Sequence, residues 1–114
     1  MKDRLYLLRP GFVNAGLGPF YCSDSTPIEG MLSFFPKLRD LIEVSYLEFP
    51  RPRSALVTLL GEGHQSLPVL VLSAGRKVKD RELAPESVNG QKIFADERNI
   101  RQYLSTQYDF PQAS

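Results

Sequence analysis

Cys22 is the only cysteine among 114 residues, and it is the residue of this chain best suited to chemistry. A thiol near the start of a helix is held as the nucleophilic thiolate when the free N–H groups there stabilise its negative charge. A lone cysteine forms no intramolecular disulfide, so a dithiol reductase cycle is excluded and only exchange with an outside thiol is open to it. One cysteine and one histidine do not make a structural zinc site, and we expect no metal.

An inert Cys22 is the alternative. Cysteine packs well as a small apolar residue, here beneath Phe20 or Tyr21. Asp24 opposes a thiolate by its like charge. If the following helix begins at Thr26, Cys22 also lies a full turn before it. Both interpretations stay open at the level of sequence.

The elements around Cys22 follow from the apolar pattern. Leu5–Leu8 is a short apolar run typical of a buried strand, and the glycine-rich stretch 11–19 predicts a loop. A helix is expected from Thr26, because Thr26 and Glu29 have capping-box spacing and Pro27 suits the first turn. Its apolar face comprises Ile28, Met31, Leu32 and Phe35.

The middle of the chain predicts a second strand, a second helix and a third strand. Apolar residues alternate over 42–46, as in a half-buried strand. Pro52 opens a candidate helix that Gly61 would end. The apolar face of that helix comprises Ala55, Leu56, Leu59 and Leu60. The run 68–72 is the most apolar of the chain and too short for a helix, which predicts a central strand.

The last part predicts a hairpin and a helix. The turn Asn89-Gly90 would join a strand at 92–94 to the residues before it. Asp96 is placed to cap a final helix. The apolar face of that helix comprises Ile100, Tyr103 and Leu104. The charged segment 76–86 lengthens the connection before the hairpin, and its role is left open.

The predicted order is β-α-β-α-β-β-α over one domain, residues 1–114. The first β-α-β unit implies parallel strands joined by a right-handed crossover, and the last hairpin is antiparallel. The expected fold class is therefore α/β, with a four-stranded mixed sheet flanked by helices.

This order, with a cysteine before the first helix and a proline opening the third strand, resembles the thioredoxin-like superfamily. The runs Leu67-Pro68-Val69-Leu70 and 96–104 resemble the thioredoxin-like domain of glutathione transferases. The run Phe20–Ser25 resembles the glutaredoxin active-site segment with its second cysteine replaced by serine. The whole chain also resembles a bacterial thioredoxin-like family of unassigned function.

The chain departs from these families at three places. Gly18-Pro19 stand where glutaredoxins carry a lysine, and Phe94-Ala95 where they carry a glycine pair. Glu97 stands where glutathione transferases carry a serine. Each departure counts against an ordinary glutathione site.

The resemblance implies roles for five residues besides Cys22. Ser25 would hydrogen-bond the thiolate, in a Cys-x-x-Ser monothiol arrangement. Pro68 would be a cis residue facing the cysteine, with the backbone of Leu67 free to pair with an extended thiol peptide. Asp96 and Glu97 would receive the amino group of a glutathione-like ligand. The plain alternatives are that Ser25 and the two acids serve only the helix starts and that the proline comes with the fold.

Two further groups are weaker candidates. His64, in a glycine-flanked loop, would act as a base beside Cys22 or simply be solvated. Arg51 and Arg53 would hold a carboxylate or phosphate, or form a solvated loop.

Composition argues against some classes of partner and indicates a cellular compartment. Fourteen basic and thirteen acidic residues leave a net charge of +1, which provides no field for nucleic acid or anionic membrane. The amino-terminal apolar run is too short for a signal peptide or a membrane span. We expect a cytoplasmic protein, where a free thiol stays reduced.

Three hypotheses follow. In the first, Cys22 forms transient mixed disulfides with glutathione or a protein thiol. In the second, the protein is a non-catalytic binding module that docks a partner beside Pro68 or forms a homodimer. The third, a shortened glutathione-conjugating enzyme, requires measurable affinity for glutathione.

Overall fold

A mixed sheet of five strands forms the centre of the protein, whose computed structural model describes all residues from Met1 to Ser114. The strands of this sheet are ordered β4-β1-β5-β7-β6. They are β1 (Arg4–Leu8), β4 (Glu43–Leu47), β5 (Val69–Val71), β6 (Glu86–Val88) and β7 (Gln91–Phe94). The helices are α1 (Thr26–Phe34), α2 (Leu38–Leu41), α3 (Ser54–Leu60) and α4 (Glu97–Tyr108). A separate two-stranded sheet contains β2 (Phe12–Asn14) and β3 (Leu17–Phe20).

The strand directions match the prediction, whereas the number of strands does not. β1 pairs parallel with β4, from Arg4↔Glu43 to Leu8↔Leu47, and antiparallel with β5. β7 pairs antiparallel with both β5 and β6. The expected α/β architecture is confirmed, but the sheet has five strands and not four, because Glu86–Val88 adds a short edge strand to β7.

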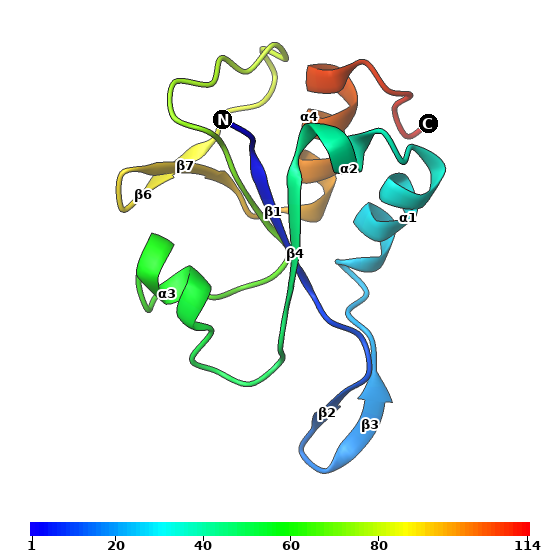
Figure 1. Cartoon of the computed structure of the whole chain (residues 1–114), viewed down its shortest axis with the longest axis vertical. Coiled ribbons are helices and arrows are strands. Elements are labelled where there is room, and N and C mark those ends of the chain that lie inside the picture. The colour runs from blue at the N-terminus through cyan, green and yellow to red at the C-terminus, as the bar shows by residue number, and fades with distance from the viewer.

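Helices cover both faces of this sheet (Figure 1). On one face, α1 and α4 pack against alternate residues of the strands, such as Leu5 and Leu70, in a core of twelve buried residues. On the other face, Leu56 and Leu60 of α3 belong to a second cluster of seven buried residues. The predicted faces of α1 and α4 are confirmed, whereas Ala55 of α3 is exposed and lies outside the core.

The stretch 11–19, expected to be a loop, contains most of a hairpin that projects from one end of the sheet (Figure 1). Its strands pair through Phe12↔Phe20 and Asn14↔Leu17. Ala15 and Gly16 both have positive φ, 54° and 76°, the conformation of a two-residue hairpin turn. Glycine and proline within the strands mask the alternation by which a strand is recognised in sequence.

The turn at Asn89-Gly90 is confirmed. Val88 pairs with Gln91 across it, and Asn89 and Gly90 have φ of 49° and 78°. Gly90→Ala therefore should lower the free energy of unfolding by about 1 kcal/mol in urea titration, since alanine is strained at positive φ. Gly63→Ala is the matched control, because Gly63 has an ordinary φ and open space around it, and should change stability little. Equal effects of the two substitutions would contradict this account.

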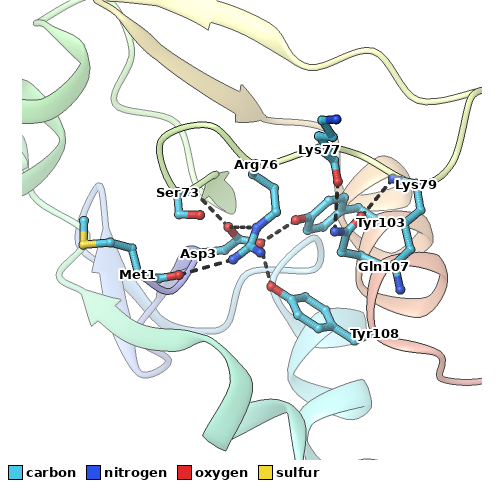
Figure 2. A network of polar contacts seen from close by, with 9 residues as sticks. All are labelled: Met1, Asp3, Ser73, Arg76, Lys77, Lys79, Tyr103, Gln107 and Tyr108. Atoms are coloured by element: carbon cyan, nitrogen blue, oxygen red, sulfur yellow. Dashed lines mark hydrogen bonds and ion pairs between the residues drawn. The ribbon is translucent and has the colours of Figure 1, made fainter.

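The long connection between β5 and β6 is held against α4 at the amino-terminal end of β1. The Ser73 N–H and Arg76 Nε donate to the buried carboxylate of Asp3 at 2.8 and 3.1 Å (Figure 2). Gln107 of α4 bonds the backbone of Lys77 and Lys79. These hydrogen bonds give the first part of the segment 76–86, whose role the sequence left open, a structural role.

The final helix begins as predicted. The Asp96 side chain accepts hydrogen bonds from the N–H groups of Arg98 and Asn99 at 2.8 and 3.2 Å, which makes it the N-cap. The longest helix has 12 residues, and none of the helices has the length and apolar character needed to cross a membrane.

Candidate functional site

Cys22 lies two residues beyond β3 and four before α1, and its side chain is half-buried. The Thr26 N–H and Thr26 Oγ1 both donate to the Cys22 carbonyl, at 3.2 and 2.8 Å. The bond from the Thr26 N–H joins residues four apart, as in an α-helix, and so continues the helical pattern back to Cys22. The cysteine therefore begins the turn that leads into α1, although regular helix starts only at Thr26.

Ser25 contacts the sulfur through its backbone and not through its hydroxyl. The Ser25 N–H donates to Cys22 Sγ at 3.4 Å. Ser25 Oγ instead accepts from the Leu8 N–H at 3.2 Å, in a position where Ser25 is 5% exposed. Ser25 occupies the N-cap position of α1 without a side-chain capping bond. Its side chain thus ties the Cys22 turn to the end of β1.

The capping box expected between Thr26 and Glu29 does not form. Thr26 Oγ1 is engaged by Cys22, and the Glu29 carboxylate turns toward β4, where it accepts from Tyr46 Oη at 2.5 Å. Arg39 Nη2 donates to the other Glu29 oxygen at 2.6 Å and to Tyr46 Oη at 3.1 Å. Glu29 is drawn away from the helix start because these two side chains offer it stronger partners than a single N–H.

A cavity of about 80 Å³ lies beside the sulfur, between β1, β4 and α1. Its apolar part comes from Leu7, Leu8 and Pro10, and its polar part from Glu29 and Tyr46. The remaining lining residues are Tyr21, Cys22, Ser25 and Thr26. A thiol, a carboxylate and a phenol thus share one small enclosure.

The phenol of Tyr46 is held in its neutral form. Burial raises the pKa of Tyr46, and the hydrogen bond to Glu29 raises it further, against a smaller lowering by Arg39. At neutral pH Tyr46 therefore remains a donor to Glu29, whose oxygens accept from Tyr46 and Arg39.

Sequence reasoning missed Glu29 and Tyr46 as members of this site. The spacing of Cys22, Thr26 and Glu29, four and then three residues, is that of one helical face and indicates that they line up. Tyr46 gave no such signal, because its place beside α1 depends on the parallel pairing of β4 with β1.

The other predicted site residues lie outside this cavity. Pro68 is buried immediately before β5 and follows a cis peptide bond, and Leu67 packs against the core cluster around α3. Asp96 caps α4, and Glu97 pairs with Arg101 at 2.7 Å. The structure therefore brings Cys22 and Ser25 together, and it leaves the two acids with partners of their own. Exposed His64 does not line the cavity either.

Arg53 is not the solvated residue that its loop predicted. It is 8% exposed, and its guanidinium donates to the carbonyls of Glu48, Phe49 and Gln65 at 3.2, 2.7 and 2.7 Å. Burial lowers the pKa of Arg53, as does Arg51, while the charge of a Cys22 thiolate acts in the opposite direction. Arg53 therefore supports the loop after β4.

Removing this guanidinium should be costly for the fold. Arg53→Met leaves three carbonyl groups without their donor, so we expect the free energy of unfolding to fall by about 2 kcal/mol in urea titration. Arg51→Met, at the exposed neighbour, should change it by less than about 0.5 kcal/mol. A stable Arg53→Met protein would show that water replaces the guanidinium at little cost.

A comparison with models of known protein families shows the family of this chain. The model of a family described as proteins of unknown function, DUF3088, matches residues 2–112. The chain belongs to the DUF3088 family. No curated protein and no solved structure matches it significantly.

The chemistry available to this DUF3088 protein centres on its thiol. No group of three or more histidine, cysteine or acidic side chains lies together as potential metal ligands. Cys22 is the only thiol of the chain, it lines the cavity, and the Ser25 N–H already donates to its sulfur.

Proposed function

We propose that this DUF3088 protein is a thioredoxin-like monothiol protein, in which Cys22 forms transient mixed disulfides with a small thiol such as glutathione or with a protein thiol. The observation that carries the proposal is the half-buried Cys22 sulfur, which accepts the Ser25 N–H at 3.4 Å beside a cavity of about 80 Å³. A reducing compartment such as the cytoplasm would keep this thiol free.

The topology supports the thioredoxin-like part of the proposal. The parallel pairing of β1 with β4 and the antiparallel pairing of β7 with its neighbours agree with the mixed sheet that the resemblance of the sequence implies. The edge strand β6 and the β2–β3 hairpin are additions to that plan. Cys22 lies just before α1, the position at which thioredoxin-like proteins carry their active cysteine.

The proposed exchange has two balanced steps. The Cys22 thiolate attacks one sulfur of an external disulfide, so that a mixed disulfide forms and the other half leaves as a thiolate. A second external thiolate then attacks the mixed disulfide, which releases Cys22 and forms a new external disulfide. The net reaction replaces one external disulfide by another and consumes one external thiolate for each one it releases, because the chain has no second cysteine.

The test is incubation of the folded protein with oxidised glutathione, followed by intact-mass measurement. We expect one glutathione per chain, attached at Cys22 and removed by excess reduced glutathione. An adduct that forms only after unfolding in urea would overturn the proposal.

A second candidate function, a binding module, is favoured by the β2–β3 hairpin. No charged residue occurs from Pro10 to Ser23, and Val13, Leu17 and Tyr21 are 59%, 66% and 68% exposed. An uncharged projecting surface of this kind is typical of a contact with another protein or with a second copy of the chain. If this is the function, Val13→Asp with Leu17→Asp should abolish partner capture or dimer formation, while Cys22→Ser leaves both intact.

A further inference from the structure

The cavity beside Cys22 has a defined chemical character. Leu7, Leu8 and Pro10 give it apolar walls, and Cys22, Glu29 and Tyr46 line it as well. Its volume of about 80 Å³ is several times the roughly 10–15 Å³ that one water molecule needs on this measure. A short alkyl group with one polar end fits such a space.

The polar groups of the cavity favour a cation at that end. Tyr46 Oη donates its proton to Glu29, so the lone pairs that remain on both groups act only as acceptors. Arg39 binds the same carboxylate and phenol but does not line the cavity. An ammonium group would find acceptors on Glu29 and Tyr46, whereas a ligand carboxylate would find no free donor on either of them, because the Tyr46 proton is already given to Glu29.

We infer that this cavity selects small aminothiols and their disulfides, with the sulfur at Cys22 and the ammonium group at Glu29 and Tyr46. The inference rests on the proposed thiol exchange and narrows its substrate class. In the exchange, the Cys22 thiolate bonds to one sulfur of the aminothiol disulfide, the sulfur–sulfur bond breaks, and one aminothiolate leaves and takes up a proton from solvent.

The experiment compares three small disulfides with equal spacers, namely cystamine, hydroxyethyl disulfide and dithiodipropionate, which are cationic, neutral and anionic. The rate constant for mixed-disulfide formation at Cys22 is measured near neutral pH on the folded chain. Each rate is divided by that of the urea-unfolded chain, which removes the intrinsic reactivity of the reagent. We expect the normalised rate for cystamine to exceed that for dithiodipropionate about tenfold, with hydroxyethyl disulfide between them.

Variants test which residues cause the preference for cystamine over dithiodipropionate. Glu29→Gln should remove this preference. Tyr46→Phe, which keeps the carboxylate, should weaken it to about threefold. Glu43→Gln is the matched control, because Glu43 is an exposed carboxylate of the same strand as Tyr46 and lies outside the cavity. If Glu29→Gln fails to fold, the result for Tyr46→Phe still decides.

The outcomes separate the two proposals. Equal normalised rates for the three disulfides, or a full preference in the Glu29→Gln or Tyr46→Phe protein, would overturn the aminothiol inference while leaving thiol exchange intact. A folded chain that forms no mixed disulfide with any of the three reagents would overturn the proposed function itself.

Discussion

Replacing Asp3 with asparagine should lower the free energy of unfolding by about 3 kcal/mol, because the substitution removes a buried charge from a fully bonded network. Asp3 is 0% exposed. Its two oxygens accept from Tyr103, Tyr108, the Ser73 N–H and Arg76 at 2.5, 2.7, 2.8 and 3.1 Å (Figure 2). Asparagine offers only one of these oxygens and leaves the Arg76 charge without its partner.

Urea unfolding of the two proteins measures this effect. Asp40→Asn, an exposed aspartate of α2, is the matched control and should change stability by less than about 0.5 kcal/mol. A global stability of about 5–15 kcal/mol makes a loss of this size easy to resolve. An Asp3→Asn protein as stable as the control would mean that the network contributes no net stability.

The same network predicts how stability depends on pH. Burial alone would raise the pKa of Asp3, but hydrogen bonds from Tyr103, the Ser73 N–H, Tyr108 and Arg76 together hold it below its usual value. The contribution of Asp3 is therefore present above about pH 3.9, where the unfolded carboxyl is ionised, and is lost as the pH falls through the lower folded value. In urea titrations across this acid range, the free energy of unfolding should fall with pH in the unchanged protein by more than in Asp3→Asn. Equal falls in the two proteins would contradict the assignment of this pH dependence to Asp3.

At alkaline pH the dependence of stability on pH comes from a raised pKa, that of Tyr108, and not from a lowered one. Burial, and next the bond to Asp3, raises the pKa of Tyr108 to about 12. The neutral phenol thus stabilises the folded state below about pH 10, the usual pKa of tyrosine, and this contribution is lost as the pH rises through the folded value. Tyr108→Phe should reduce this alkaline loss of stability in urea titrations, and the folded variant should lose the step near pH 12 in absorbance at the tyrosinate band. An unchanged absorbance titration in the variant would place the shifted group elsewhere.

Cys22→Ser should reduce thiol–disulfide exchange at least a hundredfold, to the rate without protein, because no other thiol exists in the chain. The substitution should change the free energy of unfolding by less than about 1 kcal/mol. Cys22 is only half-buried, and a hydroxyl can still accept the Ser25 N–H. The measurement is turnover of glutathione with hydroxyethyl disulfide in the presence of the purified protein.

Ser23→Ala is the control for this experiment, since Ser23 is exposed and adjacent to Cys22 but does not line the cavity. Its turnover should equal that of the unchanged chain. Turnover that persists in the Cys22→Ser protein would assign the activity to a contaminant and remove the support for a redox function.

Much of the core was predictable because its signals are local. The i, i+3, i+4 spacing of Ile100, Tyr103 and Leu104 predicts the buried face of α4, and all three are fully buried. The Asp96 cap and the Asn89-Gly90 turn depend on side-chain and backbone preferences that act within a few residues.

The features that escaped prediction depend on contacts distant in sequence. Asp3 and Tyr103 are 100 residues apart, and nothing local marks Asp3 as buried. Arg53 is buried because three loop carbonyls converge on it, those of Glu48 and Phe49 just before it and that of Gln65 twelve residues later, and no apolar or charge pattern marks this convergence. The same holds for the candidate site, where helix spacing leads from Cys22 to Glu29 but only the β1–β4 pairing adds Tyr46.

The central claim is that Cys22 is an accessible and reactive thiol in the folded protein. Its most direct test is the rate of Cys22 alkylation by iodoacetamide across pH, in the folded chain and in the urea-unfolded chain. The account predicts fast labelling of the folded chain near neutral pH, at least equal to that of the unfolded chain. Labelling that appears only on unfolding would make Cys22 a packed, inert residue and contradict the proposed function.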